Sequence, residues 1–89
     1  MQWDRILRGI MIDKISIALI DAQKKHPHFA DSLADAYVVL GEEVGEVAEA
    51  IYEHTRNGAP IEDLELEVAQ VGAVSLRFLR FIEQYKKEQ

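Results

Sequence analysis

Residues 36–51 read AYVVLGEEVGEVAEAI, and this stretch decides the fold. Its apolar residues return every three or four positions, which is the period of one face of an α-helix and not the alternation of a strand. The row that we expect to face the core consists of Ala36, Leu40, Val44, Val47 and Ile51. The stretch therefore predicts a helix on which glutamates share the surface with a core-facing row.

Signals on both sides predict where this helix begins and ends. Ser32 followed by Asp35 resembles a capping box, and the helical period continues to about Arg56. The pair Asn57-Gly58 is typical of a helix end, and Pro60 then fits the first position of a further helix.

Two more long helices flank this one. A helix from about Trp3 to Lys25 carries one apolar row, and we expect it to be buried over more than half of its circumference. That row contains Ile6, Ile10, Ile17 and Ile20. A helix from about Pro60 to Lys86 is apolar over most of the surface of its second half, so it needs neighbours on several sides. We expect one all-α domain over residues 1–89, an antiparallel bundle of three long helices that other copies complete, with four-helix-bundle packing.

Composition narrows the function classes. The chain has 89 residues, which is near the lower limit for a self-sufficient core, so a homo-oligomer (dimer or tetramer) is expected. It has no cysteine, so any metal must be held by oxygen or imidazole. The net charge of −6 argues against binding nucleic acid. No apolar run approaches the roughly 20 residues of a membrane span, and we expect a cytoplasmic protein without membrane contact.

Two pairs of polar residues lie within apolar helices. Glu43 and Glu46 are three residues apart and share a helix face, and Glu67 and Gln70 repeat this spacing on the next helix. Antiparallel packing through the turn at residues 57–60 would bring the two pairs face to face. Three carboxylates and one amide oxygen are hard ligands suited to Mg²⁺, with Mn²⁺ as the alternative. Solvated helix faces also carry such acids, and spacing alone leaves both interpretations open.

Residues 42–50, EEVGEVAEA, resemble the EExGE(L/V)xxA segment of the MazG-like all-α nucleoside triphosphate pyrophosphohydrolase superfamily. The superfamily pattern is ExxE, a variable spacer, then ExxD. Residues 67–71, EVAQV, are similar to its second half, which usually reads E(L/E)ADV. The resemblance extends from about His28 to Phe81 and implies Mg²⁺-dependent hydrolysis of a nucleotide substrate to nucleoside monophosphate and pyrophosphate.

Carried over by position, the resemblance implies that Glu43, Glu46 and Glu67 are metal ligands. Glu42 is then a further ligand or the residue that orients the attacking water. Gln70 stands where the superfamily has Asp, which keeps an acceptor oxygen and removes a charge. Three explanations of this difference compete. The site is altered but works, the chain is a catalytically inactive helical oligomerisation or interaction module, or the register is shifted and brings Asp63 or Glu65 into the site.

Three further features are open to two interpretations. Arg77 and Arg80 of the last helix could each reach a substrate phosphate, and Arg77, on roughly the same helix face as Gln70, is the better candidate. An ion pair with a helix acid is the alternative. His26 and His28 form a solvated turn or contact a base or phosphate. Gly45 and Gly72 lie inside helices, where glycine is unfavourable, and close approach of helices near the acids would explain both.

Overall fold

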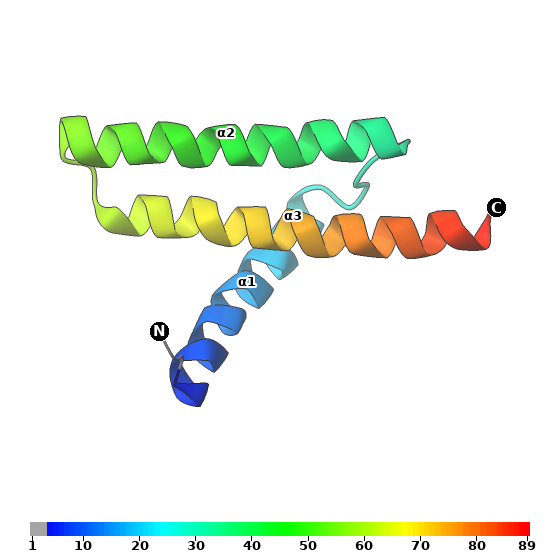
Figure 1. The fold of residues 1–89 in the computed structure, drawn as a ribbon, viewed down its shortest axis with the longest axis horizontal. Coiled ribbons are helices and arrows are strands. Elements are labelled where there is room, and N and C mark those ends of the chain that lie inside the picture. The colour runs from blue at the N-terminus through cyan, green and yellow to red at the C-terminus, as the bar shows by residue number, and fades with distance from the viewer. Residues whose placement is uncertain (1–3) are drawn as a thin grey trace.

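The computed structural model describes residues 4–89, which form three α-helices and no strand. Helix α1 spans Arg5–Lys25, α2 spans Leu33–Asn57 and α3 spans Ile61–Lys87 (Figure 1). The predicted all-α class is confirmed. Trp3, the expected start of the first helix, lies outside the described residues.

The ends of the helices follow the local signals closely. The Ser32 hydroxyl accepts a hydrogen bond from the Asp35 backbone N–H at 3.1 Å, as the capping box predicts. Helix α2 ends at Asn57, and Gly58 follows in the left-handed conformation with φ 73°, where a side chain is disfavoured. Pro60 differs from the expectation by one position, because its extended ψ of 142° makes it the cap that precedes α3.

The predicted antiparallel packing is formed by two of the three helices. Helices α2 and α3 lie side by side and antiparallel, whereas α1 packs against α3 alone and runs away from the pair (Figure 1). The described residues hold three helices, so four-helix packing is not met within one chain. Because α1 touches a single neighbour, only one stripe of it is covered.

Two glycines behave differently where helices approach each other. A Cβ atom on Gly72 of α3 would lie 2.9 Å from the side chain of Ile15 on α1, so the absence of a side chain permits this crossing. A Cβ atom on Gly45 of α2 would meet nothing within 4 Å. Close helix approach therefore explains Gly72, and the same expectation for Gly45 is wrong within the described chain.

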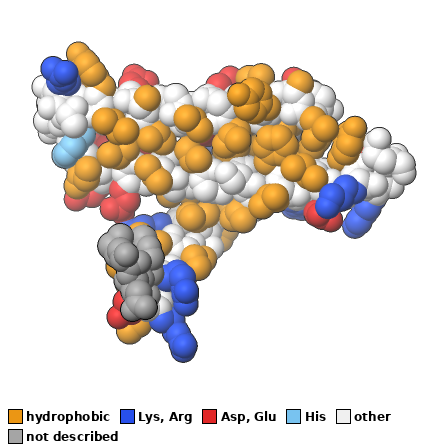
Figure 2. All heavy atoms as spheres, viewed as in Figure 1, with side chains coloured by type: hydrophobic (Ala, Val, Ile, Leu, Met, Phe, Trp, Pro, Cys, Tyr) orange, Lys and Arg blue, Asp and Glu red, His pale blue; other side chains and the backbone are white. Residues whose placement is uncertain are grey.

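The core of the described chain is small. Its buried apolar residues are Ala18, Ala36, Ala69, Ala73 and Val74. The expected burial of the α1 row is wrong for a single chain, since Ile6 is 74% exposed and Ile17 is 68% exposed. On α2, Val44 and Ile51 from the expected core row are also about half exposed. Figure 2 shows hydrophobic side chains running in a band along α2 and α3.

No helix in the described part of the chain combines the length and the apolar character that a membrane span requires.

Candidate metal centre

The turn between α2 and α3 determines which acids of the two helices lie opposite each other. Gly58 reverses the chain, and the Nδ1 atom of His54 donates a hydrogen bond of 2.7 Å to the Ala59 carbonyl oxygen, which ties the turn to the last part of α2. From this fixed point the two helices run antiparallel. Glu46 and Glu67 consequently lie at similar distances from the turn and face each other.

Three carboxylates converge between the helices. Glu43 and Glu46 of α2 and Glu67 of α3 each place one carboxylate oxygen within 4.8 Å of the other two. Glu43 and Glu67 are half-buried, and Glu46 is exposed. The predicted meeting of the two polar pairs is therefore present for these acids.

One oxygen of this group has no hydrogen-bond partner. The Oε2 atom of Glu43 is buried and accepts no hydrogen bond from any described residue. A buried acceptor left without a donor costs about 1–3 kcal/mol, and more when it is charged. This orphaned oxygen is the feature that a bound cation would explain.

Burial removes water from the carboxylates of this group, and their negative charges repel one another. Burial raises the pKa of Glu43, and the negative charges of Glu46 and Glu67 raise it further. Burial also raises the pKa of Glu67, with contact to the Glu46 carboxyl as the next cause. A divalent cation among the three carboxylates would offset both effects, and hard oxygen donors are the ligands that Mg²⁺ and Mn²⁺ take.

The three converging acids line a cavity, and the other predicted site residues line it too. Its volume is about 500 Å³, and its walls include Glu42 and Gln70 beside the three converging acids. Glu42 does not belong to the group of three oxygens within 4.8 Å. Of the two acids that a shifted register would use, Glu65 instead forms an ion pair with Lys14 of α1, and neither Asp63 nor Glu65 belongs to the converging group.

Arg77 lines this cavity beside the loop between α1 and α2 and contacts that loop. Its Nη2 group donates to the carbonyl oxygens of His26 at 2.6 Å and Pro27 at 3.4 Å. Its guanidinium lies over the Phe29 ring, 5.2 Å from the centroid. Arg77 therefore holds the loop, and of the two sequence interpretations the ion pair with a helix acid is absent among the described residues.

Sequence reasoning missed the aromatic contacts beside the site. The Phe29 ring lies 6.2 Å from both Phe78 and Phe81, measured between centroids. A phenylalanine directly after the His-Pro-His turn is the only signal that the sequence offers for this. His28 itself is exposed, and its Nε2 atom lies 2.8 Å from Asp31 Oδ1.

Comparisons with protein-family models, with curated proteins and with solved structures find no match to this chain.

Proposed function

We propose that the chain is a metal-dependent nucleoside triphosphate pyrophosphohydrolase of the MazG-like type. The observation that carries the proposal is the convergence of Glu43, Glu46 and Glu67 around an acceptor oxygen that has no hydrogen-bond partner within residues 4–89. The resemblance of residues 42–50 to the EExGE segment of that superfamily supports the same assignment. A cytoplasmic location is part of this proposal.

The donor set fits the proposed cofactor. Three carboxylate oxygens from two facing helices suit Mg²⁺, with Mn²⁺ as the alternative, and neither imidazole nor sulfur is among them. When bound, such an ion would neutralise phosphate charge and lower the pKa of a coordinated water. It would also overcome the repulsion between an anionic substrate and a chain of net charge −6.

In this mechanism each residue of the chain has a separate task. Glu43, Glu46 and Glu67 would hold the ion, and the amide oxygen of Gln70, which lines the same cavity, would offer a neutral acceptor beside them. Glu42 orients the attacking water and accepts its proton as the oxygen adds to phosphorus. The bond between the α-phosphorus and its bridging oxygen breaks, and nucleoside monophosphate and pyrophosphate are released.

We propose that a second copy of the chain completes the fold, as a dimer or a tetramer. Tyr37, Val44 and Ile51 follow each other at seven-residue intervals on α2, and all three are exposed, at 70%, 51% and 46%. Residues with this spacing share one face of a helix. Packing two α2–α3 pairs through this face would give four-helix packing and would cover apolar surface that a monomer leaves in water.

A catalytically inactive interaction module is the second candidate, and Gln70 is the observation that favours it. An amide at this position lowers the charge of the ligand set, which weakens the hold on a divalent ion. The same exposed apolar row on α2 would then serve association alone.

A turnover assay separates the two candidates. The purified protein is incubated with canonical and modified nucleoside triphosphates and Mg²⁺ or Mn²⁺, and pyrophosphate release is measured beside a Glu46→Gln variant. Turnover that the variant loses supports the enzyme. Absence of turnover, together with no rise in melting temperature on adding metal, supports the inactive module.

A further inference from the structure

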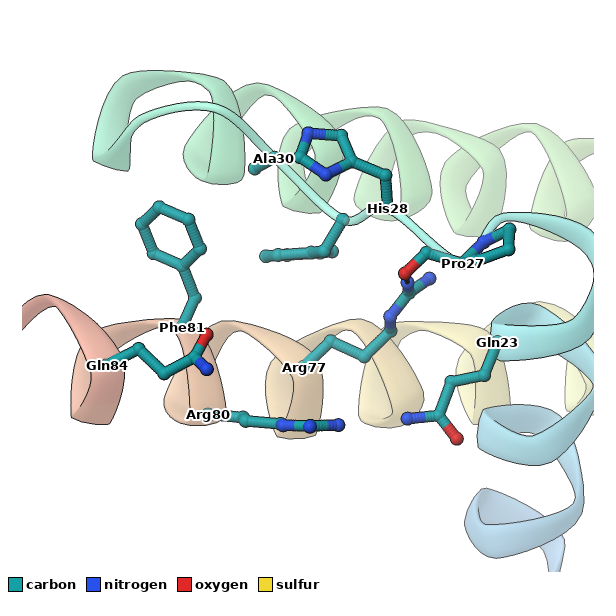
Figure 3. Close-up of a pocket in the computed structure, with 9 residues that line it drawn as sticks. Gln23, Pro27, His28, Ala30, Arg77, Arg80, Phe81 and Gln84 are labelled. Carbon is teal, nitrogen blue, oxygen red and sulfur yellow. Dashed lines mark hydrogen bonds between the residues drawn. The ribbon is translucent and has the colours of Figure 1, made fainter.

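A second cavity adjoins the acidic one, and its lining is cationic and neutral. It has a volume of about 250 Å³ and lies between the loop that joins α1 to α2 and the C-terminal half of α3. Its polar and aromatic lining includes Gln23, His28, Arg77, Arg80, Phe81 and Gln84 (Figure 3). No Asp or Glu of the described chain lines it, although the chain has sixteen of them.

The two arginines in this cavity are not neutralised by carboxylates. Within residues 4–89, the ion pairs made by Lys and Arg join Lys14 to Glu65, Lys25 to Asp21 and Lys86 to Glu83. Burial lowers the pKa of Arg77, and the positive charge of Arg80 lowers it further, so the two guanidinium groups interact unfavourably. An anion between them would turn this repulsion into attraction.

Arg77 is held in place, whereas Arg80 is exposed. The Nη2 group of Arg77 is occupied by the loop carbonyls, which leaves its Nε–H and Nη1 donors, since guanidinium carries five N–H groups. Figure 3 shows Arg77 reaching from α3 to the loop at Pro27, while Arg80 extends toward Gln23 of α1. A fixed guanidinium beside an exposed one suits a phosphate, which accepts several charge-assisted hydrogen bonds.

The cationic cavity shares part of its lining with the cavity of the candidate metal centre. His28, Phe29 and Arg77 line both cavities. Along α3, Arg77 and Arg80 lie seven and ten residues beyond Gln70, which correspond to rises of about 10 Å and about 15 Å. A polyphosphate chain bound at the three acids would therefore extend along α3 toward the two arginines.

We propose that the cavity of Arg77 and Arg80 binds the terminal phosphate of the substrate and so distinguishes nucleoside triphosphates from shorter nucleotides. This inference rests on the proposed hydrolase function. Arg80 contacts the phosphate directly, and Arg77 contacts it while its Nη2 group keeps its hydrogen bonds to the loop. A free regulatory anion would use the same chemistry, and the experiment distinguishes the two sources.

Binding is measured first without metal, so that it does not depend on turnover. Pyrophosphate is titrated by calorimetry into the protein in EDTA, with Arg80→Gln, Arg80→Lys and, as matched control, Arg56→Gln. Arg56 is exposed in the last turn of α2, outside both cavities. We expect Arg80→Gln to weaken binding by roughly tenfold or more, Arg80→Lys to recover part of it, and Arg56→Gln to bind as wild type does. Absence of binding to the wild type, or equal loss in Arg56→Gln, would overturn the proposal.

Competition identifies the source of the anion. If the cavity holds the substrate's terminal phosphate, pyrophosphate and a non-hydrolysable nucleoside triphosphate displace each other in the presence of Mg²⁺. Simultaneous binding of both would overturn the substrate assignment and indicate a separate anion. Where turnover is present, Arg80→Gln should lower the preference in kcat/KM for triphosphate over diphosphate by roughly tenfold, and an unchanged preference contradicts the inference.

The two proposals fail in distinguishable ways. Glu46→Gln should lose turnover and keep pyrophosphate binding in EDTA, because Glu46 lies outside the cationic cavity. If the wild type shows no hydrolysis but binds pyrophosphate through Arg80, the hydrolase proposal fails. Anion binding in the cavity of Arg77 and Arg80 is then still supported.

Discussion

Gly72 of α3 lies against Ile15 of α1 so closely that a Cβ atom at position 72 would be 2.9 Å from two atoms of the isoleucine side chain and 3.2 Å from a third. Both branches of that side chain are involved, and a β-branched residue has few alternative rotamers inside a helix. The crossing of α1 over α3 therefore depends on the absence of a side chain at position 72.

Gly72→Ala should accordingly destabilise the protein. Overpacking of this kind costs about 1–3 kcal/mol, and the better helix propensity of alanine returns up to about 1 kcal/mol. Urea unfolding measures the difference. Gly45→Ala is the matched control, because nothing lies within 4 Å of its Cβ position, and it should leave stability unchanged or raise it. Equal stability of the two variants would contradict the close crossing.

Glu43→Gln should stabilise the metal-free protein at neutral pH. Burial and the neighbouring acids raise the pKa of Glu43, so the folded state binds this proton more tightly than the unfolded state. Stability is therefore lost as the pH rises through the ordinary glutamate value of about 4.3 and on through the raised value. In EDTA, the melting temperature of Glu43→Gln should match wild type at about pH 4 and exceed it at neutral pH.

Added Mg²⁺ should reverse this order. The ion stabilises the wild type through the same carboxylate, whereas the amide variant gains less. Melting curves with and without Mg²⁺ at neutral pH measure both effects. A melting-temperature difference that does not change with pH would show that Glu43 is not the buried acid described above.

Gln70→Asp should tighten metal binding. The side chain at position 70 lines the cavity beside Glu67, and an additional carboxylate raises the charge of the ligand set. We expect the dissociation constant for Mg²⁺ to fall by roughly tenfold, as measured by calorimetry, and the metal-free protein to become less stable through added repulsion. Gln70→Ala provides the contrast and should bind Mg²⁺ no more tightly than wild type. Identical binding by all three proteins would place residue 70 outside the ligand set.

Val44→Glu should dissociate the proposed oligomer. Val44 is 51% exposed in the middle of the row formed with Tyr37 and Ile51, where a charge would be buried by a second copy. Sedimentation equilibrium should give a multiple of the chain mass for wild type and the mass of one chain for the variant. Val38→Glu is the control, since Val38 is 55% exposed but directly follows Tyr37 and points about 100° away from the row. A monomeric wild type would refute the row as an interface.

Local sequence signals predicted the helices and most of their ends. Ser32 caps α2, and Gly58 ends it, because capping and left-handed backbone depend on a few neighbouring residues. The meeting of Glu43 and Glu46 with Glu67 was also predictable, since one short turn joins two regular antiparallel helices. The role of Gln70 was raised by the superfamily pattern and stays a prediction.

Long-range packing decided the rest. The period of the Ile6–Ile20 row is helical, but a period does not say how many neighbours cover it, and α1 meets α3 alone. The contacts of Arg77 with His26 and Pro27 join residues about fifty positions apart, which no local pattern encodes. The amino-acid sequence by itself determined the three helices and the acids that two of them present to each other. Only the tertiary structure decided where α1 crosses and which cavity the arginines line, because both depend on side-chain contacts between segments far apart in the chain.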